Sequence, residues 1–135
     1  MKTIISQNLW RALFALLALS FSDSSLQIEL GHFDDIGLPA AMVSMERVGN
    51  AAEAAGWAIV FILSFAKNPL IAPELCLFLA GMLFFDVHTT WPLDMPLPPY
   101  FLVWGSVLAA VQILAGLSLY KKRAAFYAQE SGALS

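Results

Sequence analysis

The segment from Pro99 to Tyr120 contains no charged residue, and this run constrains the fold more than any other feature of the chain. A bilayer core of about 30 Å is crossed by about 20 helical residues, so a run of this length can span a membrane. Three further apolar segments lie at about residues 4–22, 49–66 and 72–91, and each of them includes at least one charged residue. We predict an all-α integral membrane protein, a bundle of four transmembrane helices at about 4–22, 49–66, 72–91 and 99–120.

The composition agrees with lipid as the solvent. Of the 135 residues, 59 % are hydrophobic and 13 % are charged, whereas soluble proteins carry about 25 % charged residues. The expected partner is therefore the lipid bilayer, with other membrane subunits or a second copy as further possibilities. A formal charge of −3 argues against a nucleic-acid partner, because no basic stripe is present to neutralise phosphates. The single cysteine, Cys76, excludes a disulfide or a cysteine pair within the chain.

The basic residues predict the orientation of the helices. Four crossings place six of the seven Lys and Arg residues on one side of the membrane, and the positive-inside bias makes that side cytoplasmic. Both termini are then cytoplasmic. The six residues are Lys2, Arg11, Lys67, Lys121, Lys122 and Arg123, and the seventh, Arg47, lies in the first external loop.

We expect a single transmembrane domain over residues 1–123, with external loops at 23–48 and 92–98 and a cytoplasmic tail at 124–135. Within the first loop, LPAAMVSMERV is predicted to form a short helix on the outer surface or in the mouth of the bundle. The proline-rich stretch WPLDMPLPPY, residues 91–100, is predicted to be a stiff, non-helical connection.

The N-terminal segment admits another interpretation. Lys2, an apolar run from Ala12 to about Phe21 and the small residues Ala18 and Ser20 are also typical of a secretory signal peptide. Cleavage of residues 1–22 would leave three helices with the new N-terminus outside.

Three carboxylates are predicted to lie at one depth in the membrane. Asp23, Glu53 and Asp86 each lie about 18 to 21 Å above the cytoplasmic edge, at about 1.5 Å per helical residue. Intramembrane carboxylates are costly and usually face a partner or a water pocket. With His88 and Arg47 they could line an outward-facing polar pocket for protons, a cation or the head of a quinone-like ligand. Alternatively, each acid is hydrated near the interface or pairs with Arg47 for a purely structural purpose.

No metal or cofactor is predicted. Asp86 and His88 are two residues apart, which places them on different faces of a helix. A second possible ligand group lies in the first loop and consists of His32, Asp34 and Asp35. Neither group has a recognised metal-ligand spacing. A haem ligated by His32 and His88 has no support beyond the two residue types, and the cofactor stays unknown.

Small residues predict close helix packing. Ala52 and Gly56 form a small-xxx-small pair in the second segment, and Gly105, Ala109, Gln112 and Gly116 form one stripe in the fourth. Such stripes allow two helices to approach closely, and Gln112 can hydrogen-bond across the contact.

The layout also resembles a known family. The relevant segments are WRALFALLAL, GLP in the first loop, ERVGNAAEAAGWAIVFIL, FFDVHTTW and the proline-rich link before the last helix. Over about residues 8–120 this layout is similar to the DoxX-like group of four-helix membrane proteins, in which Arg11, Glu53 and His88 match the pattern. The founding name belongs to a small subunit of a membrane thiosulfate:quinone oxidoreductase. The resemblance implies a redox-linked accessory role in a prokaryotic cytoplasmic (inner) membrane.

Three functions follow as hypotheses. The first is an accessory subunit of a quinone-linked membrane redox system, without catalytic activity of its own, because no flavin fingerprint or cysteine pair is present. The second is a small proton- or solute-coupled transporter that uses the carboxylates. The third is a membrane scaffold or assembly factor without a ligand site.

Overall fold

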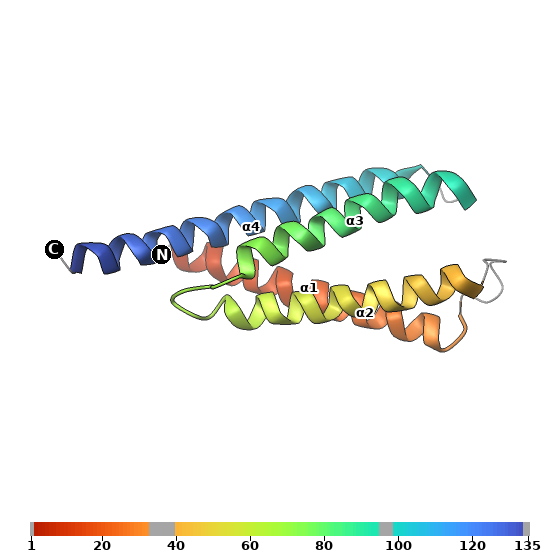
Figure 1. The fold of residues 1–135 in the computed structure, drawn as a ribbon, viewed down its shortest axis with the longest axis horizontal. Helices are drawn as coiled ribbons and strands as arrows, with labels where there is room; N and C mark the ends of the chain where they lie inside the picture. Colours follow the sequence, from red (N-terminus) through yellow and green to blue (C-terminus); the bar gives the residue numbers. More distant parts are fainter. Residues whose placement is uncertain (1, 33–39, 95–98, 134–135) are drawn as a thin grey trace. The chain divides into compact units, whose positions relative to one another are not determined.

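The computed structural model describes residues 2–32, 40–94 and 99–133, and the regular structure in these ranges is α-helical (Figure 1). The four helices are α1 (Lys2–Glu29), α2 (Ala40–Leu63), α3 (Ala72–Asp94) and α4 (Tyr100–Ala133). The prediction of an all-α chain with four helices is confirmed. The chain divides into two compact units, residues 1–61 and 62–135, and we describe each unit by itself.

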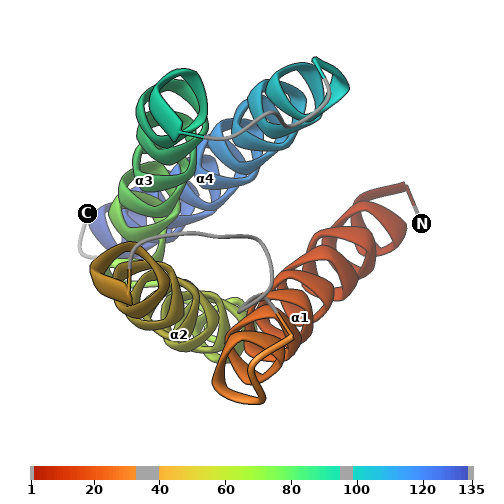
Figure 2. The same ribbon diagram turned by 90° about the vertical axis from the view of Figure 1, so that its right-hand side faces the viewer.

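In the first unit, α1 and α2 run antiparallel beside each other (Figure 2). Phe14 of α1 stacks on Trp57 of α2, with 5.9 Å between the ring centroids and 13° between the planes. Both side chains are fully buried, as is Val60 one turn after Trp57. Because residues three and four apart share a helix face, Glu53, Trp57 and Val60 form the buried side of α2.

Helix α1 is longer than predicted, because it continues past Ser22 to Glu29. The stretch SDSSLQIE contains no glycine or proline, so nothing breaks the helix before Gly31. Gly31 has a φ of 76°, and the N–H of His32 donates to the carbonyl of Gln27 at 3.1 Å. This is the hydrogen bond of a Schellman cap, in which a left-handed glycine ends the helix.

Helix α2 also differs from the prediction, since it begins at Ala40 rather than near Gly49. Residues 40–48 of the segment predicted as a separate short helix form the N-terminal part of α2. Gly49 does not interrupt it, because one glycine costs a helix only about 1 kcal/mol. The predicted external loop of residues 23–48 is thus largely helical, and its residues 33–39 lie outside the described residues.

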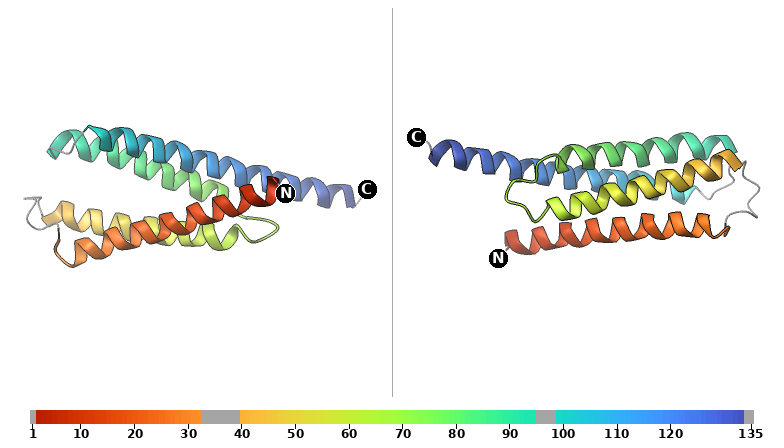
Figure 3. Two further views of the ribbon diagram at one scale, coloured as in Figure 1. Left: turned by 180° about the vertical axis from the view of Figure 1, so that it is seen from behind. Right: turned by 60° about the horizontal axis from the view of Figure 1, so that its bottom comes forward.

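In the second unit, α3 and α4 run antiparallel and lie side by side (Figure 3). Two glycines of α4 allow this approach. A Cβ atom on Gly105 would lie 2.5 Å from Cγ2 of Val87, and one on Gly116 would lie 3.0 Å from Cβ of Cys76. Neither position has room for a side chain unless α3 shifts.

Both helices of this unit exceed their predicted limits. Helix α3 continues to Asp94, so residues 91–94 are helical, contrary to the prediction for WPLDMPLPPY. Helix α4 continues to Ala133, so residues 124–133 of the predicted cytoplasmic tail are helical, because AAFYAQE contains good helix formers and no glycine or proline. In Figure 1, α4 extends beyond the start of α3.

Two helical stretches among the described residues, Ser6–Glu29 and Leu102–Gly132, are long and apolar enough to cross a membrane. The length and hydropathy that qualify them are also found in signal sequences and in core helices of soluble proteins. Four membrane crossings and the orientation of the termini stay predictions.

Candidate functional site

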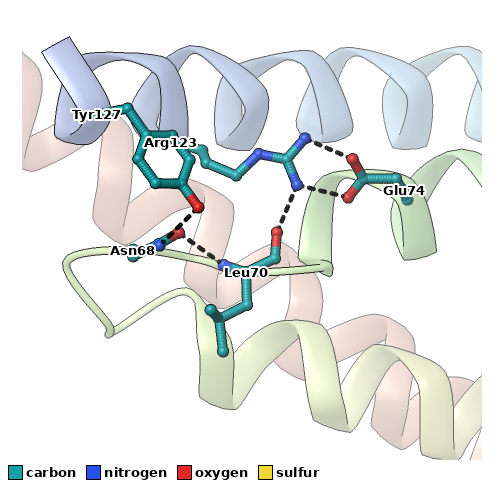
Figure 4. A network of polar contacts seen from close by, with 5 residues as sticks. All are labelled: Asn68, Leu70, Glu74, Arg123 and Tyr127. Carbon is teal, nitrogen blue, oxygen red and sulfur yellow. Dashed lines mark hydrogen bonds and ion pairs between the residues drawn. The ribbon is translucent and has the colours of Figure 1, made fainter.

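A polar network joins α4 to the turn before α3 (Figure 4). The guanidinium of Arg123 donates from Nη1 to Oε2 of Glu74 at 2.8 Å and from Nη2 to Oε1 of the same carboxylate. Nη1 also donates to the carbonyl of Leu70 at 2.6 Å. One arginine therefore holds both the first turn of α3 and the backbone that precedes it.

The turn at Leu70 has a special backbone conformation. Leu70 has a φ of 49°, in the left-handed region that non-glycine residues rarely adopt. Its N–H donates to Oδ1 of Asn68 at 3.1 Å, an Asx turn, and its carbonyl accepts from Arg123. Asn68 in turn donates from Nδ2 to the hydroxyl of Tyr127 at 3.2 Å. Side chains from α4 thus hold a strained turn on both sides.

The same end of the unit contains a surface hollow of about 590 Å³. Its lining combines apolar, aromatic and cationic groups: Leu70, Ile71, Tyr120, Arg123, Ala124 and Tyr127. Lys122, the residue before Arg123, donates from Nζ to the carbonyl of Ser64 at 2.8 Å. Ser64 is not part of this lining.

Glu53 is a buried carboxylate in the first unit, with 4 % of its surface exposed. It lies one turn before Trp57, whose indole Nε1 donates to Oε2 of Glu53 at 3.0 Å. Burying a carboxylate is costly unless it is hydrogen-bonded or paired. The stacked ring of Phe14 behind Trp57 helps to fix the donor in place.

The other predicted pocket residues of this unit do not join Glu53. Asp23 is exposed and accepts a hydrogen bond from Gln27 at 3.3 Å. Arg47 forms an ion pair with Glu29 at 2.5 Å, and its carbonyl accepts from the hydroxyl of Ser25 at 3.2 Å. Arg47 therefore ties α2 to the end of α1 through Glu29, which is not one of the three carboxylates that we expected near it.

Asp86 and His88 lie on α3, in the second unit, and are half-buried. Nδ1 of His88 lies 2.8 Å from the carbonyl oxygen of Phe84, and its ring stacks on the ring of Phe84 with centroids 3.9 Å apart. A meeting of Asp86 with Glu53 stays a prediction, because the two residues belong to different units.

The small-residue stripe of α4 lies against α3. Gly105 and Gly116 face Val87 and Cys76, as described above, and Ala109 is buried. Gln112 is fully buried, and neither polar atom of its side chain has a hydrogen-bond partner among the described residues. On α2, Gly56 is buried but Ala52 is exposed, so the expected packing of Ala52 is not observed.

Among the described residues, no group of three or more His, Cys, Asp and Glu side chains lies close enough to hold a metal ion. His32 is described, with Nδ1 in contact with Oε1 of Gln27. Asp34 and Asp35, which we considered with it, lie outside the described residues.

The sequence did not reveal the pairing of Arg123 with Glu74. Arg123 was considered only as one of the cytoplasmic charges, and Glu74 lies in the first turn of α3. The available signal was that an acid begins one helix and a base follows the apolar part of the next. In antiparallel neighbours, these two positions lie at the same end.

No family model, curated protein or solved structure matches this chain. The function must therefore be argued from the residues and their geometry.

Proposed function

We propose that this chain is a multi-pass integral membrane protein with both termini in the cytoplasm, in a four-helix arrangement. The supporting observation is the apolar surface that its helices leave exposed. On α1, Leu9, Leu16 and Leu19 are each about two-thirds exposed, and on α4 Val103 and Trp104 are similarly open. Water would penalise such a surface at about 25 cal/mol per Å², whereas lipid does not.

The aromatic and basic residues of α4 support the same proposal. Tyr100 and Tyr120 are both more than half exposed and are separated by about 30 Å along the helix, the thickness of a bilayer core. Tyrosine is enriched at both membrane interfaces, and basic residues are enriched on the cytoplasmic side. Lys121, Lys122 and Arg123 follow Tyr120 directly, which supports a cytoplasmic location for that end of α4.

Within the membrane, we propose that the chain acts as an accessory subunit that binds a larger protein. The DoxX-like layout favours a quinone-linked oxidoreductase of a prokaryotic inner membrane as that partner. Exposed apolar side chains on every helix, including Ile62 of α2 and Phe85 of α3, provide surface for lipid and for a partner helix alike.

Two measurements test this proposal. In a Cys76→Ser background, Ser131→Cys should be shielded from an impermeant maleimide in intact cells, and Ser44→Cys should react. Extraction in mild detergent followed by cross-linking should then recover an oxidoreductase subunit whose quinone reduction falls when this chain is deleted. Labelling of Ser131→Cys in intact cells would contradict the topology. Recovery of the chain alone, with unchanged quinone reduction, would contradict the accessory role.

The buried Glu53 favours a second function, a proton-coupled carrier. Buried carboxyl groups inside membrane-spanning helices are the residues that proton relays of pumps and transporters use. In proteoliposomes, Glu53→Gln should abolish proton flux while Asp23→Asn, which changes an exposed acid, should leave it intact. Flux that survives Glu53→Gln would exclude this carrier mechanism.

A further inference from the structure

The hollow at the start of α3 has an amphiphilic lining. Leu70 and Ile71 are 53 % and 63 % exposed, and Tyr120 and Tyr127 are 55 % and 51 % exposed. Arg123 lies over the ring of Tyr120, with 5.4 Å from its Cζ to the ring centroid. Exposed aliphatic side chains beside a cation and two phenol groups suit a ligand with a charged head and an apolar body.

Arg123 retains hydrogen-bonding capacity toward this hollow. A guanidinium has five N–H donors. Three of them reach the carbonyl of Leu70 and the carboxylate of Glu74, two from Nη1 and one from Nη2. The remaining two, on Nη2 and Nε, bond to none of the described residues. The two bonds to Glu74 fix the orientation of the guanidinium, so the two remaining N–H groups can donate to a ligand without further ordering of the side chain.

The charge around the hollow is positive. Lys121 follows Tyr120 of the lining directly, and Lys67 precedes Asn68, which bonds to Tyr127. Both lysines are exposed and form no hydrogen bond or ion pair with the described residues, and Arg123 adds a third cation. Glu74 compensates one of these charges, and Glu130 lies two turns further along α4. The excess of cations favours an anionic ligand.

We propose that this hollow binds the headgroup of an anionic phospholipid of the cytoplasmic leaflet. The inference rests on the proposed membrane location, which brings lipid headgroups to this end of α4. The lipid phosphate accepts from Arg123 and Lys121, and the exposed Leu70 and Ile71 contact the glycerol and upper acyl region. Basic pockets on the cytoplasmic side of membrane helices are suited to such headgroups.

Native mass spectrometry of the full chain in detergent tests the site. The chain is incubated with phosphatidylglycerol or with phosphatidylcholine of the same acyl chains, and bound lipid is counted. Ala124→Trp fills the hollow without changing the charge. Lys121→Gln removes a cation beside the hollow, and Lys122→Gln is the matched control, because Lys122 reaches the carbonyl of Ser64 instead.

We expect the unaltered chain to retain phosphatidylglycerol in preference to phosphatidylcholine. Ala124→Trp should abolish this preference, and Lys121→Gln should weaken binding about fivefold, the effect of one basic residue near an anionic headgroup. Lys122→Gln should bind like the unaltered chain. Thermal unfolding of each variant shows whether a loss of lipid reflects a loss of folding.

Three results would overturn the lipid site. The first is equal retention of the two lipids by the unaltered chain. The second is an equal loss for the two lysine variants with no effect of Ala124→Trp, which indicates diffuse charge attraction. The third is displacement of lipid by millimolar inorganic phosphate, which indicates a site for a free anion. Resistance of the chain to alkaline carbonate extraction from membranes is measured separately, so failure of the membrane location is distinguished from failure of the lipid site.

Discussion

Arg123 and Glu74, which are 49 residues apart in the sequence, form a two-point ion pair in which each carboxylate oxygen accepts from a different guanidinium nitrogen. The same arginine holds the carbonyl of Leu70, where the backbone is left-handed. This pair therefore connects the helix that follows the turn, the turn itself and α4.

Arg123→Lys should loosen this end of the second unit although the charge is kept. An ammonium group is a point charge and cannot reproduce the planar, two-point geometry of a guanidinium. Amide hydrogen exchange in residues 68–76 should become faster. Arg11→Lys is the matched control, since Arg11 bonds to Asn8 in the other unit and should leave that segment unchanged. Equal exchange rates in Arg123→Lys and the unaltered chain would contradict this role.

Trp57→Phe should destabilise the chain by about 1–3 kcal/mol, because the buried carboxylate of Glu53 loses a hydrogen-bond donor. The measurement is thermal or denaturant unfolding in detergent. Adding Glu53→Leu to Trp57→Phe should cost less than the sum of the two single changes, since the carboxylate that needs the donor is gone. Additive effects would show that the two side chains are not coupled.

Gly105→Ala should be destabilising. The new methyl would lie 2.5 Å and 2.9 Å from the two methyl groups of Val87, and overpacking costs about 1–3 kcal/mol. Val87→Ala should rescue Gly105→Ala by providing the missing space. Gly81→Ala, where nothing lies within 4 Å, is the control and should stabilise α3 by up to about 1 kcal/mol. A harmless Gly105→Ala would disprove close packing of α3 and α4 at this point.

Gln112→Leu should raise the stability of the chain. The amide is buried with neither polar atom bonded to a described residue, and an unsatisfied buried polar group costs about 1–3 kcal/mol. Unfolding of the purified chain in detergent measures the effect. A loss of stability in Gln112→Leu would mean that the amide is satisfied in the protein as it exists in solution.

The helical class and the presence of a helix in each of the four apolar runs could be predicted, because apolar runs of about 20 residues leave few other solutions. The ends of the helices could not. A left-handed cap at Gly31 ends α1 at Glu29, seven residues later than the change from apolar to polar residues at Ser22 suggests. The apolar runs mark which residues avoid water, whereas helix ends depend on local capping and hydrogen bonding, which continue through polar sequence.

In the candidate site, too, some features could be predicted from the sequence and others could not. Burial of Gly116 and Gln112 on one stripe of α4 follows from their spacing of four residues, which is a property of the helix alone. Arg47 was expected near the carboxylates, but it pairs with Glu29, a partner that became reachable because α1 is longer than predicted. Glu53 was foreseen as a costly acid, but the sequence pattern did not show that Trp57 would be its donor.

By itself, the sequence determined that this chain is helical and which of its surfaces are apolar, because these properties depend on residue type and on the period of the helix. Only the tertiary structure showed that Arg123 donates hydrogen bonds to Glu74 and to the carbonyl of Leu70, and that a hollow lies beside them. Such contacts join residues far apart in the chain, and their geometry depends on how α3 and α4 align when their glycines allow close approach.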